Sequence, residues 1–112
     1  MITFDRIVVL SKPFPGIEVS TSYGTPALKV GKKLLLRMHQ KEDAIVMLLD
    51  SVADQERLIQ DDPMCFFITD HYVGYAAVLV RPIVEEPLLL ELLERSWRRV
   101  ARKKDLDAFA GL

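Results

Sequence analysis

Few side chains in this sequence could carry out chemistry, and they are widely spaced. The chain has two histidines, His39 and His71, and one cysteine, Cys65. A zinc site needs three or four ligands at a recognisable spacing, so no metal site is predicted. A single cysteine also excludes an intramolecular disulfide. Because Cys65 begins an apolar run with no cation beside it, we expect a small buried side chain rather than a reactive thiol.

His71 has the most suggestive neighbours, in the stretch Thr69-Asp70-His71-Tyr72. A hydroxyl, a carboxylate and an imidazole are adjacent there, but catalytic triads assemble from distant segments. A polar turn whose Thr69 and Asp70 side chains cap the backbone is the expected structure. Gly24 and Gly31 lie between strand-like runs and do not open a helix, so no phosphate-binding loop is predicted. We therefore expect a protein that is not an enzyme and needs no cofactor.

Basic side chains outnumber acidic ones at the two ends of the sequence, and acidic ones outnumber basic ones in the middle. Residues 1–40 carry six basic and two acidic side chains, residues 41–94 three and twelve, and residues 95–112 six and two. With a net charge of −1 and a pI near 6.1, the chain does not have the composition of a protein that coats nucleic acid. If the two basic segments lie on the same side of the fold, they form a local basic surface beside an acidic middle.

The basic side chains fall into two candidate groups. Tyr23 and several lysines surround a predicted hairpin, a composition suited to contacting a nucleic-acid backbone. In the last helix, Glu91/Arg95 and Glu94/Arg98 have the spacing of stabilising pairs, which leaves Arg99 to Lys104 without partners. The candidate nucleic-acid-binding residues are Lys29, Lys32, Lys33, Arg37, Arg99, Arg102 and Lys103. The alternatives are hairpin lysines that discourage edge pairing and helix-end cations that favour the helix dipole.

The hydrophobic pattern predicts one α+β domain over residues 1–112. Thr3 is the expected N-cap of a first helix that Pro13 ends. The further expected elements are strands at 18–23, 27–30, 33–38 and 44–49, a helix at 52–60, strands at 65–69 and 76–80, and a helix from 86 to about 103. Because strands in succession lack helical crossovers, this α-β4-α-β2-α order predicts an antiparallel sheet with helices on one face, a two-layer arrangement.

Two strands are apolar at both parities, namely 34–36 and 45–49. A sheet with one face in water should alternate, so both faces are expected to be covered. Leu35, Ile45 and Met47 are assigned to the second face, where the cover would be residues 106–110, a second subunit, a ligand or loops. The apolar run at 7–10 is too short for a signal sequence or a membrane span, so a cytoplasmic protein without membrane contact is expected.

Three segments together resemble a known family. They are Pro15-Gly16 with Thr-Ser-Tyr-Gly-Thr-Pro-Ala-Leu-Lys-Val-Gly-Lys at 21–32; Asp62-Pro63 with Phe-Phe-Ile-Thr-Asp-His-Tyr-Val-Gly-Tyr at 66–75 and Val-Leu-Val-Arg at 78–81; and Leu-Leu-Glu-Arg-Ser-Trp-Arg-Arg-Val-Ala at 92–101. In this order they resemble the MmcQ/YjbR family, small bacterial proteins described as DNA-binding. The resemblance implies a double-wing fold like that of secretion chaperones, with hairpins as wings and no catalytic residues. Ala76-Ala77 departs from the family's Pro-Trp.

These observations give one leading hypothesis and one alternative. The first is a non-enzymatic DNA-binding domain that contacts phosphates, weakly and without sequence preference, through the basic hairpin and the end of the last helix. The second is a protein-interaction module or homodimer that uses the second apolar sheet face and binds no nucleic acid. Phosphate binding requires the two basic segments to converge in the fold, whereas an interaction module requires an exposed apolar patch.

Overall fold

The computed structural model describes residues 1–111. The elements in chain order are α1 (Phe4–Ser11), β1 (Ile17–Ser22), β2 (Thr25–Val30), β3 (Lys33–Met38), β4 (Ile45–Leu48), α2 (Val52–Asp61), β5 (Phe66–Phe67), the 3₁₀ turn η1 (Asp70–Tyr72), β6 (Ala77–Val80), α3 (Glu86–Val100) and α4 (Lys103–Ala110). The α+β class and the predicted order are confirmed, with an additional helix at the end. Thr3 caps α1 as expected, since its hydroxyl accepts from the Arg6 amide at 3.2 Å.

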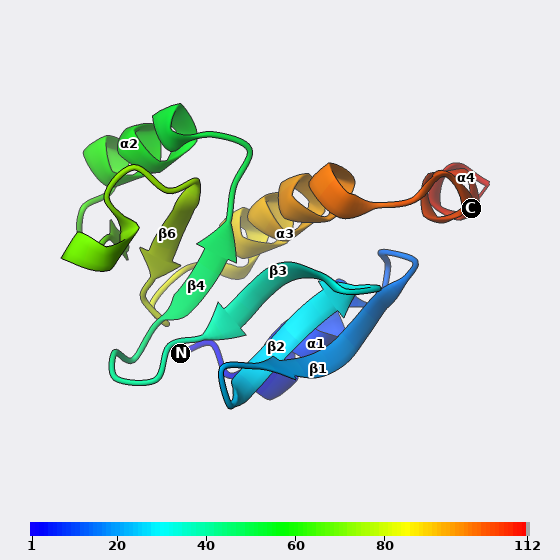
Figure 1. Cartoon of the computed structure of the whole chain (residues 1–112), viewed down its shortest axis with the longest axis horizontal. Helices are drawn as coiled ribbons and strands as arrows, with labels where there is room; N and C mark the ends of the chain where they lie inside the picture. The colour runs from blue at the N-terminus through cyan, green and yellow to red at the C-terminus, as the bar shows by residue number, and fades with distance from the viewer. Residues whose placement is uncertain (112) are drawn as a thin grey trace.

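The strands form one antiparallel sheet in the order β1-β2-β3-β4-β6-β5 (Figure 1). β1 and β2 pair from Ile17 with Val30 to Ser22 with Thr25, which leaves a two-residue turn. Both turn residues have positive φ, 52° at Tyr23 and 75° at Gly24. This is the backbone of the type I′ turn, which matches the twist of a tight hairpin.

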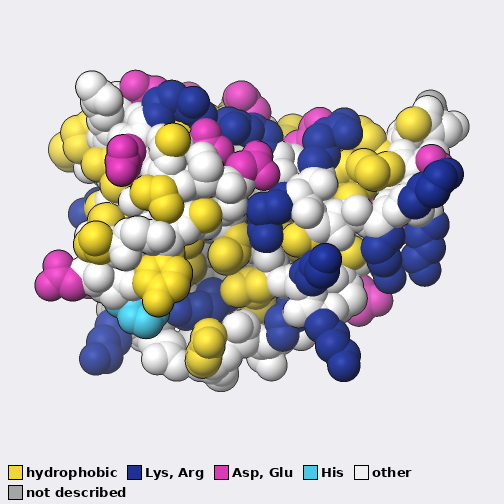
Figure 2. All heavy atoms as spheres, turned by 45° about the horizontal axis from the view of Figure 1, so that its top comes forward, with side chains coloured by type: hydrophobic (Ala, Val, Ile, Leu, Met, Phe, Trp, Pro, Cys, Tyr) yellow, Lys and Arg dark blue, Asp and Glu magenta, His cyan; other side chains and the backbone are white. Residues whose placement is uncertain are grey.

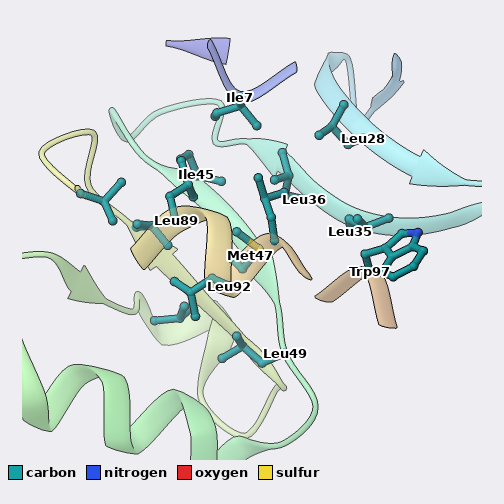
Figure 3. Close-up of a cluster of buried hydrophobic side chains, with 14 of the residues drawn as sticks. Ile7, Leu28, Leu35, Leu36, Ile45, Met47, Leu49, Leu89, Leu92 and Trp97 are labelled. Atoms are coloured by element: carbon teal, nitrogen blue, oxygen red, sulfur yellow. The ribbon is translucent and has the colours of Figure 1, made fainter. Parts of the chain in front are cut away.

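α1 and α3 supply the helical side of the main core. Figure 3 shows Ile7 of α1 and Leu89 and Trp97 of α3 among strand side chains such as Leu36 and Met47. All five are completely buried. α2 lies beside α3, because Asp54 of α2 and Arg95 of α3 form an ion pair at 3.5 Å. Arg95 was expected to pair with Glu91, and that prediction is wrong.

A β-bulge accounts for the leucine triplet of β3. Leu28 pairs with Leu36 and Lys29 with Leu34, so Leu35 is an extra residue on β3. Leu35 and Leu36 consequently both point into the main core. The assignment of Leu35, Ile45 and Met47 to the second sheet face is therefore wrong, since all three are buried in the core with α1 and α3.

The C-terminal segment also differs from the expectation. α3 ends at Val100 because Ala101 is extended, with φ −61° and ψ 136°, so the predicted continuation to residue 103 is wrong. The phenyl ring of Phe109 on α4 packs against the rings of Phe14 and Trp97, with centroids 5.7 and 5.0 Å away. Residues 106–110 thus extend the core on the helical face and do not cover the second sheet face.

Candidate functional site

A cavity of about 540 Å³ lies on the second sheet face. Its apolar lining comes from β3, from β4 and the residue after it, and from the start of β6 and the residue before it: Leu34, Val46, Leu48, Leu49, Ala76 and Ala77. Figure 2 shows hydrophobic side chains in the middle of this face, with Lys and Arg side chains gathered beside them. The second face therefore carries apolar side chains, as the double parity of these strands indicated, but residues other than those predicted supply them.

The cavity exists because β3 and β4 diverge. They pair only from Leu36 with Met47 to Met38 with Ile45, and the strands separate beyond that point (Figure 1). The carbonyls of β3 that no longer face β4 are bonded by α3. The Ser96 hydroxyl donates to the Leu35 oxygen at 3.3 Å, and the Arg99 guanidinium donates to the Leu34 oxygen at 2.7 Å. The end of α3 is thereby fixed at the edge of the cavity.

One buried amide holds the wall of the cavity opposite α3. The Gln55 side chain on α2 is 3% exposed, and its Nε2 donates to the carbonyls of Tyr72, Tyr75 and Ala77 at 3.0, 2.8 and 2.8 Å. Tyr72 is the last residue of η1, Ala77 is the first residue of β6, and Tyr75 lies in the connection between them. The sequence places either Gln55 or Glu56 on the inner stripe of this charged helix, and nothing in the pattern identifies the partners of Gln55, which lie 17 to 22 residues away.

His71 lies on the rim of this cavity and forms no triad. Its ring stacks on the Tyr75 ring, with centroids 6.0 Å apart and planes at 10°. The turn begins with the Tyr72 amide donating to the backbone oxygen of Thr69 at 2.9 Å. The Thr69 side chain makes no capping bond, so the predicted cap is wrong at that residue. This stretch therefore positions the rings of His71 and Tyr75 against each other at the cavity rim.

Arg37 belongs to the cavity rather than to the hairpin surface. Its Nη2 donates to the Tyr72 hydroxyl at 2.7 Å, and its guanidinium lies 5.2 Å from the centre of the Tyr23 ring. Its Nη1 donates to the Met38 oxygen at 3.3 Å. Among residues 1–111, no carboxylate lies within ion-pair distance of Arg37. The charge therefore faces an apolar cavity lined by aromatic rings.

Arg99 is the second guanidinium in the lining. Partial burial lowers the pKa of Arg99, an effect that the charge of Asp50 opposes. The Arg99 guanidinium stays protonated at neutral pH because the ordinary pKa of arginine lies far above neutrality. In the described part of the chain, Arg99 has no ion pair either. Two cations thus border one cavity, and each is held by hydrogen bonds to neutral oxygens.

The hairpin lysines lie close to this second cation. Lys32 and Lys33 are exposed at the turn between β2 and β3. Lys29 is partly exposed and is paired directly with Leu34 of the cavity lining and with Glu18 on β1. Since Arg99 bonds the Leu34 oxygen, the end of α3 and the base of the hairpin share one end of the molecule. Figure 2 shows a concentration of Lys and Arg side chains there.

Two predicted binding residues have internal partners instead. The Arg102 guanidinium donates to Asp105 at 2.8 Å, and the Lys103 ammonium donates to Asp107 at 2.8 Å. The prediction that these cations are unpaired is therefore wrong, because α4 places an acid three or four residues beyond each. Hydrogen bonds from Arg102 lower the pKa of Asp105. The expected Glu94–Arg98 pair is confirmed at 2.9 Å.

Cys65 is buried, as predicted. Desolvation is the main cause that raises the pKa of its thiol, and the charge of Asp62 acts in the same direction. The thiolate is therefore scarce at neutral pH. Within residues 1–111, no cluster of three or more His, Cys, Asp or Glu side chains could hold a metal ion. No helix of the described part has the length and apolar character to cross a membrane.

The comparison with protein families found one matching family. A model of the YjbR family matches residues 12–99. The chain belongs to the YjbR family. Curated relatives include "Uncharacterized protein Rv2570" of Mycobacterium tuberculosis and "Uncharacterized protein Mb2600" of Mycobacterium bovis, each 30% identical in an alignment of 112 positions that covers 84% of this chain and 87% of the relative. No solved structure matches.

The YjbR match includes the cavity but not the last helix. Tyr23, Arg37, Tyr72 and Arg99 all fall within residues 12–99. α4 and the paired Arg102 lie outside that range. The region that defines family membership therefore contains the hairpin, the aromatic rim and both cavity arginines.

Proposed function

We propose that this YjbR-family protein is a non-enzymatic DNA-binding domain that contacts the phosphate backbone with Lys29, Lys32, Lys33 and Arg99. The observation that supports this proposal is the 2.7 Å bond from the Arg99 guanidinium to the Leu34 oxygen. It holds the end of α3 against the base of the β2–β3 hairpin. Positive charge from both ends of the sequence is thereby gathered on one surface, as phosphate binding requires.

The number of phosphate contacts sets the strength of this interaction. Arg102 and Lys103 are paired with Asp105 and Asp107, and Arg37 points into the cavity, so about four of the predicted binding cations remain without an acidic partner. With roughly four contacts, binding is expected to be micromolar or weaker at physiological salt and indifferent to base sequence. Glu18, which faces Lys29 across β1 and β2, weakens it further.

The experiment is a titration of duplex DNA with wild-type protein and with the Lys32→Ala/Lys33→Ala double variant, at several salt concentrations. Each lost phosphate contact should reduce the salt slope by nearly one, so the double variant should lose about two. The matched control is Lys41→Ala/Arg57→Ala, which removes two exposed charges from the β3–β4 turn and α2. Equal slopes for all three proteins would contradict the proposal.

A second candidate function is association through the second sheet face, with a further copy of the chain as the partner. The supporting observation is the exposure of Tyr23, Val73 and Tyr75, which are 78%, 66% and 61% accessible. Tyr23 and Tyr75 line the cavity, and Val73 precedes Tyr75 in the same connection. Light scattering at micromolar concentration should then report twice the 12.8 kDa chain mass. A monomer would reject this candidate.

A further inference from the structure

The cavity on the second face has the size and lining of a site for a planar ligand. Its volume of about 540 Å³ lies in the range of small-molecule pockets. Leu34, Val46 and Leu48 provide an apolar floor, and the rings of Tyr23 and Tyr75 stand at the rim. A planar aromatic group would bury apolar surface on the floor and stack against the rim rings.

The positive charges at the cavity favour the binding of an anion. Arg37 and Arg99 both line it, and neither has an ion-pair partner in residues 1–111. Lys29 lies on the same sheet face because it pairs with Leu34. Two guanidinium groups are best neutralised by a dianion, and a phosphate monoester carries a charge of about −1.5 to −2 at neutral pH. Guanidinium groups also match phosphate oxygens in geometry.

Tyr23 adds an independent observation. Its φ of 52° lies in the left-handed region, in a turn position that normally favours Asn, Asp or Gly. A bulky residue there is strained, and such strain is concentrated at ligand-binding positions. The conformation exposes the ring and places it under the Arg37 guanidinium, 5.2 Å away. An aromatic ring at this turn is thus costly for folding and useful for stacking.

Two polar groups remain for the edge of a base. The Tyr72 hydroxyl accepts from Arg37, so its own hydrogen is free to donate. The Gln40 side chain donates from Nε2 to the Tyr23 backbone oxygen, so its carbonyl oxygen is free to accept. Both residues line the cavity. A donor and an acceptor beside an apolar floor are the complement of a nucleobase edge.

We propose that this cavity binds one nucleotide, with its base on the apolar floor and its phosphate on Arg37 and Arg99. The nucleotide could be free or an unpaired unit of a single strand, and the recognising chemistry is the same for both. This inference goes beyond the proposed function, because binding of duplex phosphates uses the hairpin lysines and Arg99 at the cavity edge and places no base on the apolar floor.

The test is titration with adenosine 5′-monophosphate, followed by backbone amide chemical shifts in two-dimensional NMR spectra. The expected shift changes cluster at the cavity, around Tyr23, Val46 and Tyr72. Adenosine and inorganic phosphate, titrated separately, should each bind at least about tenfold more weakly, because each lacks one half of the recognised group. Absence of shift changes at the cavity would overturn the proposal, as would equal binding of phosphate alone or adenosine alone.

Variants separate the two halves of the site. Arg37→Gln should weaken binding of the monophosphate by about tenfold, with adenosine binding unchanged. Arg57→Gln, an exposed charge on α2, is the control and should bind as wild type does. Tyr23→Asn suits the turn better and cannot fail through strain, so weaker nucleotide binding by this folded variant would report the lost ring. Unchanged affinity of both Arg37→Gln and Tyr23→Asn would overturn the proposal.

Two further arms identify the source of the nucleotide and exclude a dimer. If a short oligodeoxyadenylate strand changes the same amide shifts and binds with higher affinity than the monophosphate, the site takes an unpaired unit of a strand. If only the monophosphate changes these shifts, the site takes a free nucleotide. A dimer that buries the cavity would overturn the proposal. Lys32→Ala/Lys33→Ala should leave monophosphate binding unchanged, so failure of duplex binding is distinguishable from failure of this site.

Discussion

Replacing Gln55 by leucine tests how the wall of the cavity is held. The Gln55 amide donates to three carbonyls at 2.8 to 3.0 Å, although an amide has only two hydrogens, so the third bond is shared. Leucine has a similar size and removes every donor. The Tyr72 and Tyr75 carbonyls also accept from the backbone amides of Tyr75 and Ala77, so the variant leaves at most the Ala77 carbonyl without a partner. Because a buried carbonyl without a partner costs about 1 to 3 kcal/mol, we expect Gln55→Leu to lower the free energy of unfolding by about 1 to 3 kcal/mol.

Urea denaturation followed by circular dichroism measures this loss. Gln60→Leu on the same helix is the control, since Gln60 is exposed and should change stability by less than about 0.5 kcal/mol. For Gln55→Glu the direction of the pH dependence is predicted. A carboxylate facing three carbonyls has a raised pKa in the folded state, so the stability of this variant should be greatest at acid pH and should fall as the pH rises through that pKa. A Gln55→Leu protein as stable as Gln60→Leu would refute the role assigned to Gln55.

Three further predictions concern the C-terminal core. Trp97→Ala should lose about 3 to 5 kcal/mol in urea denaturation, because Trp97 is fully buried, whereas exposed Leu90→Ala should not; an equal effect would contradict the assignment. Gly16→Ala should lose on the order of 1 to 3 kcal/mol, because Gly16 has φ +86° and an added Cβ would lie 2.5 Å from an Asp105 carboxylate oxygen; a neutral variant would exclude this contact. Arg102 lowers the pKa of Asp105, so the ionised carboxylate stabilises the fold above its ordinary pKa, and this stabilisation is lost as the pH falls through the lowered pKa. In thermal melts, the melting temperature of Asp105→Asn should therefore fall less steeply at acid pH than that of the wild type, and an equally steep fall would contradict this assignment.

The sequence predicted the elements that depend on local chemistry. Thr3 specifies the start of α1 because its hydroxyl caps a nearby amide. The apolar stripe through Leu89, Leu93 and Trp97 predicts α3 because its spacing is helical. Pairing of successive strands follows from the short turns at Gly24 and Gly31. The first turn consists of Tyr23 and Gly24, so the predicted strand to Tyr23 and the predicted turn at residues 24–26 are each displaced by one or two residues. Each of these signals lies within a few residues of the structure that it forms.

The features that the sequence did not reveal depend on distant contacts. The bulge at Leu35 follows from pairing with β2, and no local pattern separates an inward leucine from an outward one. Arg37 has its partner Tyr72 35 positions away, so it was assigned to the hairpin surface. The local sequence does not indicate the break at Ala101, because the charged residues before and after it are good helix formers. The cavity likewise depends on residues that are far apart in the sequence, from Tyr23 and Arg37 to Tyr72 and Arg99.

The most direct test of the proposed DNA binding is the salt dependence of duplex affinity, measured by fluorescence anisotropy. About four phosphate contacts predict a slope of log affinity against log salt near −3.6, so affinity should fall roughly a hundredfold between about 50 and 200 mM salt. Duplexes of unrelated sequence should give the same curve, since the contacts are to the backbone. A slope near zero, or no binding at the lowest salt, would contradict the proposal that this YjbR-family surface binds DNA.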